Sequence, residues 1–315
     1  MVLAATRFSA RSRFLDLRAL AALAHTRFVT THHIEGNYSG RHRSKQQGGA
    51  AEFVDFREYS AGEDLRRLDW KVLARTGRPY VRLYQDEVNL NCTVVLDVSN
   101  SMTFAGTGRG SGRGADHGVK VSKLEYAQYL ATALSHVIEQ QQDQVGLAVV
   151  ADKLIDVIPP AGTRSHVLRL QDAIEQLNPQ PATALADPLR ELFMRLTRRG
   201  VLLVMSDFLV DDLEKLCASL RLFKHRRWEV ILLHLVHPEE ERLPEGLAYR
   251  FEGMENEGRI DCSPIDVRRL YEERFEAHAA SVRRLGLAAG CDYRRVSTAT
   301  PYLRTLGEFL VERSG

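Results

Sequence analysis

The stretch from Cys92 to Ser101, Cys-Thr-Val-Val-Leu-Asp-Val-Ser-Asn-Ser, constrains the fold more than any other part of the chain. Its apolar run is rich in β-branched residues and does not alternate with polar ones. This pattern predicts a strand buried on both faces, as in a parallel α/β sheet. The run ends in Asp97, Ser99 and Ser101. Because ligands of open α/β sheets bind outside the carboxyl ends of strands, these residues form a candidate site.

Asp97, Ser99 and Ser101 allow two interpretations. A carboxylate and two hydroxyls at alternate positions of a tight loop can face one point, where a hard divalent cation takes oxygen ligands. Alternatively, the same side chains can cap backbone N–H groups in an ordinary turn. This stretch alone leaves both interpretations open, so the rest of the chain must decide between them.

The composition is typical of a soluble globular protein. The 315 residues are 44% hydrophobic and 27% charged, which suits one large core or two modest ones. Lys and Arg number 43 and Asp and Glu 41, so the net charge of +2 gives no general reason to expect DNA or a membrane surface as the partner. No C-x-x-C pair occurs, and charges interrupt every apolar run before about 18 residues. We therefore expect a cytoplasmic protein without a membrane span.

From Cys92 onward, hydrophobic periodicity alternates between strands and helices. Strands are predicted at 92–96, 145–150, 153–158, 201–205 and 230–236, and helices at 123–142, 167–177, 184–198, 213–223, 267–285 and 302–311. A tight turn precedes the strand at 153–158, which is therefore expected to be antiparallel and to end at Pro159-Pro160. With right-handed crossovers, this order predicts an α/β fold: a doubly wound, mostly parallel sheet with helices on both faces.

The N-terminal part follows another pattern. A packing helix is predicted by apolar residues at spacings of three and four, Phe14, Leu17, Ala21, Ala24 and Phe28. Strands are predicted at 51–59 and 80–88. We therefore divide the chain into residues 1–90, an N-terminal helix with a small β-containing segment, and 91–315, the α/β domain. A Gly-rich insertion at 105–118 has too few apolar side chains to pack, so we expect it to be flexible.

A second carboxylate at a strand end favours the metal interpretation. Asp207 follows the strand predicted at 201–205, and Thr183 lies in a loop before a helix. Both are expected at the edge of the sheet that carries Asp97. Five oxygen-bearing side chains should then converge: Asp97, Ser99, Ser101, Thr183 and Asp207. Such a donor set suits Mg²⁺, with Mn²⁺ or Ca²⁺ as alternatives.

This D-x-S-x-S arrangement with a later Thr and Asp resembles the metal-ion-dependent adhesion site of von Willebrand factor A domains. In those domains, Mg²⁺ keeps an open position that a partner's carboxylate fills. The resemblance therefore implies a protein-interaction module that binds an exposed Asp or Glu of a partner through the cation.

Further motifs resemble the bacterial domain-of-unknown-function family fifty-eight. They are Gly40–Ser44, Glu52-Phe53, Arg57–Asp64, Arg67–Trp70, Ala74–Thr76 and Tyr80–Arg82. That family couples such a segment to a von Willebrand A-like domain and is commonly associated with MoxR-type AAA+ ATPases, which implies a chaperone-like or assembly role. This chain departs from the pattern in two respects: Pro181-Ala182 stands where such sites often have glycines, and the Gly-rich insertion is unusually long.

Two alternatives come from other classes of protein. Basic and aromatic residues around Trp70 suit RNA binding, although acidic residues among them favour local ion pairs. An aspartate at a strand end can also accept a phosphoryl group, but Ser99 stands where a phosphatase of the haloacid-dehalogenase type has a second aspartate. We therefore predict a binding module and no enzyme. RNA binding through the N-terminal segment is the alternative, and a Mg²⁺-dependent phosphatase or hydrolase is less favoured.

Overall fold

The chain forms two units. The computed structural model describes residues 12–21, 26–29, 52–60, 68–85, 90–106, 121–243, 249–255 and 258–314. Contacts within the chain separate a small unit, 32–89, from a large unit made of 1–31 and 90–315. Most of the predicted Gly-rich insertion, residues 107–118, lies outside the described residues.

The first 31 residues belong to the large unit, whereas the sequence division placed them with the segment up to residue 90. The reason is aromatic packing. The buried Phe14 ring packs edge-on against Tyr129 at a centroid distance of 4.8 Å, and the buried Phe28 ring lies 5.9 Å from that of Phe309. These contacts tie the N-terminal residues to helices of the large unit.

The N-terminal helix is shorter than the predicted one. Helix α1 covers only Leu17–Leu20, and residues 26–29 are not helical. Residues 22–25 of the predicted helix lie outside the described part of the chain.

The small unit contains a strand pair and a short helix. Strands β1 (Glu52–Glu58) and β2 (Tyr80–Gln85) pair antiparallel, with a register shift after Phe53. Helix α2 (Trp70–Thr76) begins after Asp69, whose carboxylate accepts two backbone N–H groups of its first turn. Both strands lie within the ranges predicted from the sequence.

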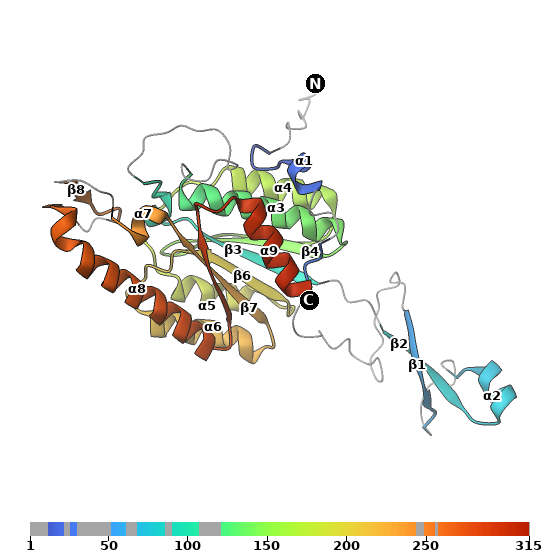
Figure 1. The fold of residues 1–315 in the computed structure, drawn as a ribbon. Helices are drawn as coiled ribbons and strands as arrows, with labels where there is room; N and C mark the ends of the chain where they lie inside the picture. The colour runs from blue at the N-terminus through green and yellow to red at the C-terminus, as the bar shows by residue number, and fades with distance from the viewer. Residues whose placement is uncertain are drawn as a thin grey trace, which may run out of the picture. The chain divides into compact units, whose positions relative to one another are not determined.

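The large unit is built on a six-stranded sheet with the strand order β10-β7-β6-β3-β4-β5 (Figure 1). Its strands are β3 (Asn91–Asp97), β4 (Gln144–Val150), β5 (Leu154–Ala161), β6 (Val201–Ser206), β7 (Glu229–Val236) and β10 (Asp292–Ser297). Every neighbouring pair is parallel except β4 and β5. The predicted α/β class with a mostly parallel sheet is confirmed.

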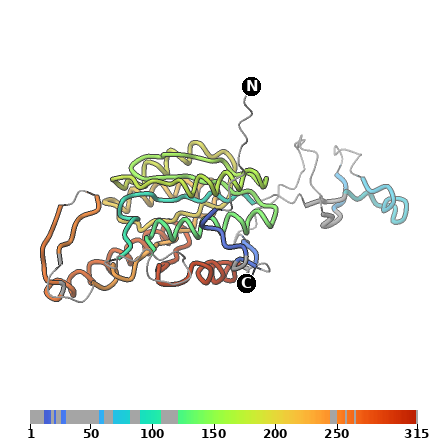
Figure 2. The backbone as a smooth tube through the Cα atoms, turned by 90° about the horizontal axis from the view of Figure 1, so that it is seen from above, coloured from blue at the N-terminus to red at the C-terminus, as the bar shows by residue number. Residues whose placement is uncertain are grey.

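Helices cover both faces of this sheet (Figure 1, Figure 2). One face carries α3 (Lys123–Gln140), α4 (Arg164–Glu175) and α9 (Tyr302–Ser314), and the other carries α5 (Ala186–Arg195), α6 (Leu213–His225) and α8 (Pro264–Ala288). Alternate residues of β6 pack against the helices on opposite faces of the sheet. Leu202 and Val204 join the apolar cluster under α5 and α6, whereas Leu203 and Met205 face α3 and α9.

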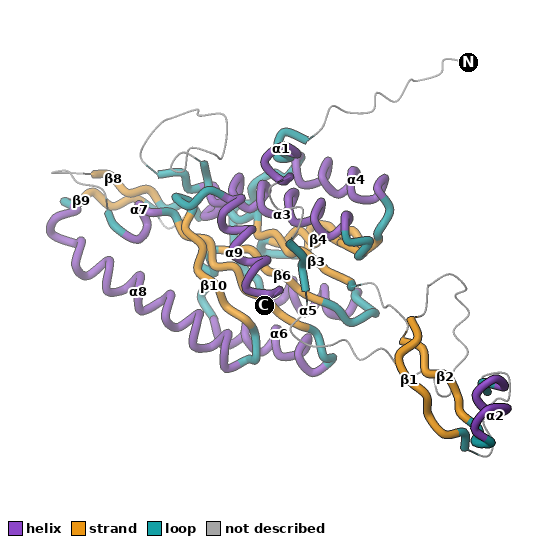
Figure 3. The backbone as a smooth tube through the Cα atoms, turned by 45° about the vertical axis from the view of Figure 1, so that its right-hand side comes forward, coloured by secondary structure: helices purple, strands orange, loops and turns teal. Residues whose placement is uncertain are grey.

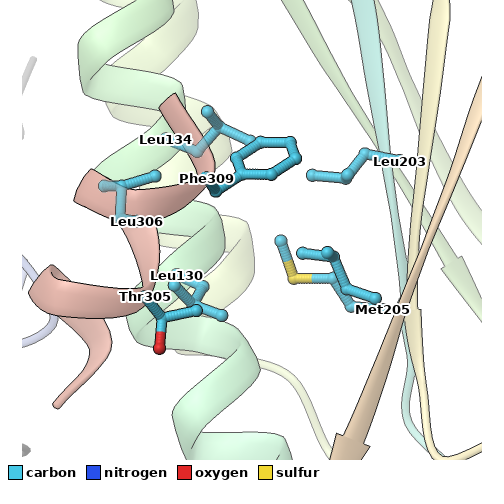
Figure 4. Close-up of a pocket in the computed structure, with 8 residues that line it drawn as sticks. Leu130, Leu134, Leu203, Met205, Thr305, Leu306 and Phe309 are labelled. Atoms are coloured by element: carbon cyan, nitrogen blue, oxygen red, sulfur yellow. The ribbon is translucent and has the colours of Figure 1, made fainter. Parts of the chain in front are cut away.

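A small apolar gap remains between α3, α9 and the sheet (Figure 4). Its lining residues are Leu130, Leu134, Leu203, Met205, Leu233, Thr305, Leu306 and Phe309. The single hydroxyl among them, on Thr305, already hydrogen-bonds to the Tyr126 hydroxyl over 2.7 Å. The gap therefore presents no unpaired polar group to a ligand and is a feature of packing.

Two edge strands differ from the predictions. Strand β5 does not end at Pro159-Pro160 but continues through both residues to Ala161. An edge strand tolerates proline because its outward side needs no N–H donor. Strand β10 was not predicted, because only Val296 of its six residues is buried and the rest of its sequence is largely polar. No helix among the described residues combines the length and apolar character that crossing a membrane requires.

Candidate metal and ligand site

Asp97 and Asp207 lie together because β3 and β6 are parallel neighbours. Asp97 is the last residue of β3, and Asp207 directly follows Ser206, the last residue of β6. The Ser206 hydroxyl donates to Asp97 Oδ2 over 2.6 Å, and the Ser99 N–H donates to Asp97 Oδ1 over 2.9 Å. Asp97 is 0% exposed, so the chain itself fixes both oxygens of this carboxylate.

The hydroxyls of Ser99 and Ser101 connect the two carboxylates. Their Oγ atoms lie 3.0 Å apart. The Ser99 side chain also hydrogen-bonds to Asp97, and the Ser101 side chain to Asp207. The short 3-10 helix η3 (Asn100–Thr103) begins between these serines and turns their side chains to the same side.

The loop that carries Thr183 is fixed beside this cluster by its backbone. At one end the Gln180 N–H donates to Val98 O over 2.7 Å, and at the other the Ala184 N–H donates to Ala151 O over 3.1 Å. Thr183 N–H, Thr183 O–H and Ser101 N–H all donate to one carboxylate, that of Glu255. The structure therefore brings the five predicted site residues together, with Pro181-Ala182 in place of glycines.

The cluster also contains a buried ammonium group that was not predicted from the sequence. Lys123, the first residue of α3, has a side chain that is 0% exposed. Its Nζ donates to Asp207 Oδ2 over 2.7 Å and to the carboxylate of Glu240, which lies in α7 (Pro238–Glu241). A lysine in the first turn of a helix opposes the helix dipole, and this unfavourable position was the available sequence signal.

The electrostatics of the two aspartates differ. Burial, and then the negative charge of Asp207, raise the pKa of Asp97 to about 7. Burial also opposes ionisation of Asp207, but the charge and hydrogen bond of Lys123 hold the pKa of Asp207 below its ordinary value. Although burial alone would lower it, the pKa of Lys123 is raised by Asp207 and Glu240. Asp207 is thus paired with the positive charge of Lys123, whereas no positive side chain in the described part of the chain stabilises the charge of Asp97.

Comparison with known proteins identifies the family. Residues 55–281 match the family described as protein of unknown function DUF58. The chain belongs to the DUF58 family. This match confirms the recognition made from the motifs at 40–82 and from the adhesion-site pattern. It spans parts of both units and the whole candidate site.

Relatives and solved structures resemble most of the chain. Uncharacterized proteins of Mycobacterium tuberculosis and Mycobacterium bovis are each 25% identical over 307 residues, which cover 95% of this chain and 90% of the relative. An aerotolerance-related membrane protein from Bacteroides fragilis is 17% identical with a TM-score of 0.48, covering 71% of this chain and 100% of that one. BatB from Bacteroides thetaiotaomicron is 18% identical with a TM-score of 0.45, covering 72% and 99%. The SpRpn10 VWA domain is 12% identical with a TM-score of 0.38, covering 70% and 94%.

The donor set of this DUF58 protein fits a hard divalent cation. Asp97 and Asp207 offer carboxylate oxygens, and Ser99, Ser101 and Thr183 offer hydroxyls, the oxygen ligands that Mg²⁺ accepts. Among the described residues, no group of three or more His, Cys, Asp or Glu side chains is arranged to hold a metal. A site in which hydroxyls supply the other ligands does not require such a group.

The charge balance points the same way. Lys123 is the ammonium in direct contact with the cluster, and it binds Asp207 and Glu240. The carboxylates of Asp97 and Glu255 adjoin the same loops. Negative groups therefore outnumber the positive one within the described part of the site, and a divalent cation would offset the excess.

We expect Ser206→Ala to lower the free energy of unfolding by about 1–3 kcal/mol, the usual loss when buried polar groups are left without a partner. The Ser206 hydroxyl donates to Asp97 and also accepts the Phe208 N–H over 2.8 Å. Asp97 and Phe208 are fully buried, so water does not replace these bonds. Urea denaturation of the wild type and the variant measures the change. Ser165→Ala, at an exposed serine, is the control, and equal stabilities of all three proteins would contradict the expectation.

Proposed function

We propose that this DUF58 protein is a metal-dependent protein-interaction module. A divalent cation, Mg²⁺ in the first place, would be held by Asp97, Ser99, Ser101, Thr183 and Asp207 and would bind the carboxylate of an Asp or Glu on a protein partner. The observation that supports this function is the convergence of two buried carboxylates and three hydroxyls at one edge of the sheet. The von Willebrand A-like fold is consistent with an interaction module.

The environment of Asp97 favours binding over catalysis. A carboxylate that accepts a phosphoryl group must present an oxygen to the incoming phosphorus atom. Asp97 is 0% exposed, so a bulky phosphoryl donor cannot reach it. Its oxygens accept hydrogen bonds from Ser99 and Ser206, but a carboxylate has about four lone-pair sites and can still bind a small cation. We therefore propose no phosphatase or hydrolase activity.

The family resemblance and the cysteines support a proposal for the partner and the compartment. We propose a MoxR-type AAA+ ATPase as the partner and a chaperone-like or assembly role for the pair. Cys92, Cys217, Cys262 and Cys291 are all free thiols, which suits a reducing compartment such as the cytoplasm.

Magnesium calorimetry on the full chain tests the proposal. We expect one Mg²⁺ site in the wild type and an affinity weaker by up to about tenfold in Ser101→Ala, because water can replace one neutral ligand in part. Ser135→Ala is the control, since the buried Ser135 hydroxyl donates to Thr132 O within its own helix. Absence of Mg²⁺ binding by the wild type at millimolar concentration would refute the metal function.

Capture experiments test the partner side. Wild-type protein and Asp207→Asn are immobilised and exposed to a cell extract in Mg²⁺, and the bound proteins are eluted with EDTA. A specific partner is retained by the wild type in Mg²⁺, released by EDTA and absent from the variant. Retention that is the same in EDTA and in Mg²⁺ would count against a cation-mediated contact.

A further inference from the structure

A hairpin between α7 and α8 reaches the candidate site. Strands β8 (Tyr249–Glu252) and β9 (Arg259–Cys262) pair antiparallel and form their own sheet, separate from the six-stranded one (Figure 3). The β9 strand is largely exposed, with Ile260 at 66%. An isolated two-stranded hairpin is marginally stable, so contacts made by its turn contribute strongly to its position.

The turn of this hairpin places one carboxylate on the site. Glu255 Oε1 accepts the Thr183 hydroxyl over 2.7 Å and the Ser101 N–H over 3.3 Å, and Glu255 Oε2 accepts the Thr183 N–H over 3.1 Å. Beside it, Asn100 Nδ2 donates to Met254 O over 3.1 Å. Two of the loops that carry candidate metal ligands therefore hold the same acidic residue, and the loop after β3 also binds the carbonyl before it through Asn100.

We propose that Glu255 is an internal ligand of the site, and that a partner's acidic residue binds by displacing the β8–β9 hairpin. The Ser101 and Thr183 donors recognise a carboxylate through charge-assisted hydrogen bonds, whatever chain supplies it. This inference rests on the proposed function, because it assumes that a partner's carboxylate binds beside Ser101 and Thr183. In the absence of a partner, Glu255 occupies this position.

The geometry also specifies the chemistry of the partner. The ligand is an acidic side chain in a turn or an extended segment, and the carbonyl of the preceding residue accepts the Asn100 amide, as Met254 O does here. An internal ligand on a short tether has an effective concentration in the millimolar range. A single free carboxylate therefore competes poorly. The partner must supply further contacts outside the Glu255 position.

Competition with a peptide tests the internal ligand. The probe is a fluorescein-labelled peptide with the sequence of residues 249–262, carrying serine in place of Cys262. Full-length wild type, Glu255→Ala and Glu252→Ala are titrated in Mg²⁺ and in EDTA and followed by fluorescence anisotropy. Glu252 is the matched control, because it lies in the same hairpin and pairs with Arg259 at the surface.

We expect Glu255→Ala to bind the peptide at least about tenfold more tightly than the wild type, because the millimolar internal competitor is gone. Glu252→Ala should bind as the wild type does. A second peptide that carries glutamine in place of Glu255 should bind the Glu255→Ala protein no more tightly than it binds the wild type. Equal binding by the wild type and Glu255→Ala, equal binding of the two peptides, or no binding by any of the proteins would each overturn the proposal.

Hydrogen exchange supplies a readout that needs no added ligand. In Glu255→Ala, exchange should rise by about tenfold or more in the hairpin and at the Ser101 and Thr183 amides, since local opening controls protection. Glu252→Ala should leave the latter two amides unchanged, and unchanged exchange in Glu255→Ala would also overturn the proposal. If the peptide gain is the same in EDTA and Mg²⁺, the internal ligand is supported and the cation-dependent part of the proposed function fails.

Discussion

Lys123→Met lowers the free energy of unfolding by about 3–5 kcal/mol in EDTA, as expected when one partner of a buried ion pair is removed. Methionine keeps an unbranched chain of similar length but removes the ammonium group. Asp207 and Glu240 then lose the hydrogen bonds and the counter-charge that Lys123 supplies. Asp207 is only 2% exposed, so water cannot replace that charge without opening the structure.

Urea denaturation in EDTA measures this effect. Lys153→Met is the control, because Lys153 is exposed, and its stability should stay within about 0.5 kcal/mol of the wild type. If Lys123→Met is as stable as Lys153→Met, Lys123 is not the electrostatic support of the site. In that case the contacts with Asp207 and Glu240 carry little free energy.

Magnesium should restore part of the stability that Lys123→Met loses. A ligand that binds only the folded state raises its stability in proportion to its affinity and concentration. Because the variant leaves the negative charge of Asp207 unbalanced, we expect Mg²⁺ to raise the melting temperature of Lys123→Met more than that of the wild type. An equal rise in both proteins would mean that ammonium and metal do not act on the same charge.

Local pattern was enough to predict five of the six strands of the sheet and the five oxygen donors. Asp97 and Asp207 each end an apolar run, and parallel strands bring such ends to one edge without further information. Thr183 was predicted less directly, because its position depends on the backbone bonds of Gln180 and Ala184. The geometry brings these donors together, while their role as metal ligands remains a prediction.

The rest of the cluster depends on tertiary structure that has no local signature. Glu255 lies in the sequence Gly-Met-Glu-Asn-Glu-Gly, and nothing in that sequence indicates contacts with loops more than 70 residues away along the chain. Glu240 lies in a short helix in which three glutamates follow one another, so sequence alone cannot choose among them. The edge strand β10 escaped prediction for a related reason, since one buried residue in six gives no periodicity.

Asp97→Asn weakens Mg²⁺ binding by about 100-fold or more, because the site loses one unit of charge and a hard anionic ligand. The substitution keeps the shape of the side chain. An amide oxygen can still accept the Ser99 N–H, and the amide NH₂ can donate to the Ser206 hydroxyl. Burial, and then the negative charge of Asp207, raise the pKa of Asp97. In the variant, Asp207 no longer faces a second carboxylate. The fold should therefore tolerate the variant in EDTA.

Calorimetry with MgCl₂ and urea denaturation in EDTA, carried out on the same samples, separate the two roles of Asp97. The control is Asp172→Asn, at an exposed position of α4, which should match the wild type in both measurements. If Asp97 serves metal binding, Asp97→Asn loses Mg²⁺ affinity while its unfolding midpoint in EDTA stays the same or rises. If Asp97 is instead a structural cap for the turn after β3, the variant loses stability in EDTA and the wild type shows no Mg²⁺ site to lose. The two interpretations of Asp97, as a metal ligand and as a cap of the turn, therefore predict different Mg²⁺ binding and different stability in EDTA. Together the two experiments decide between them.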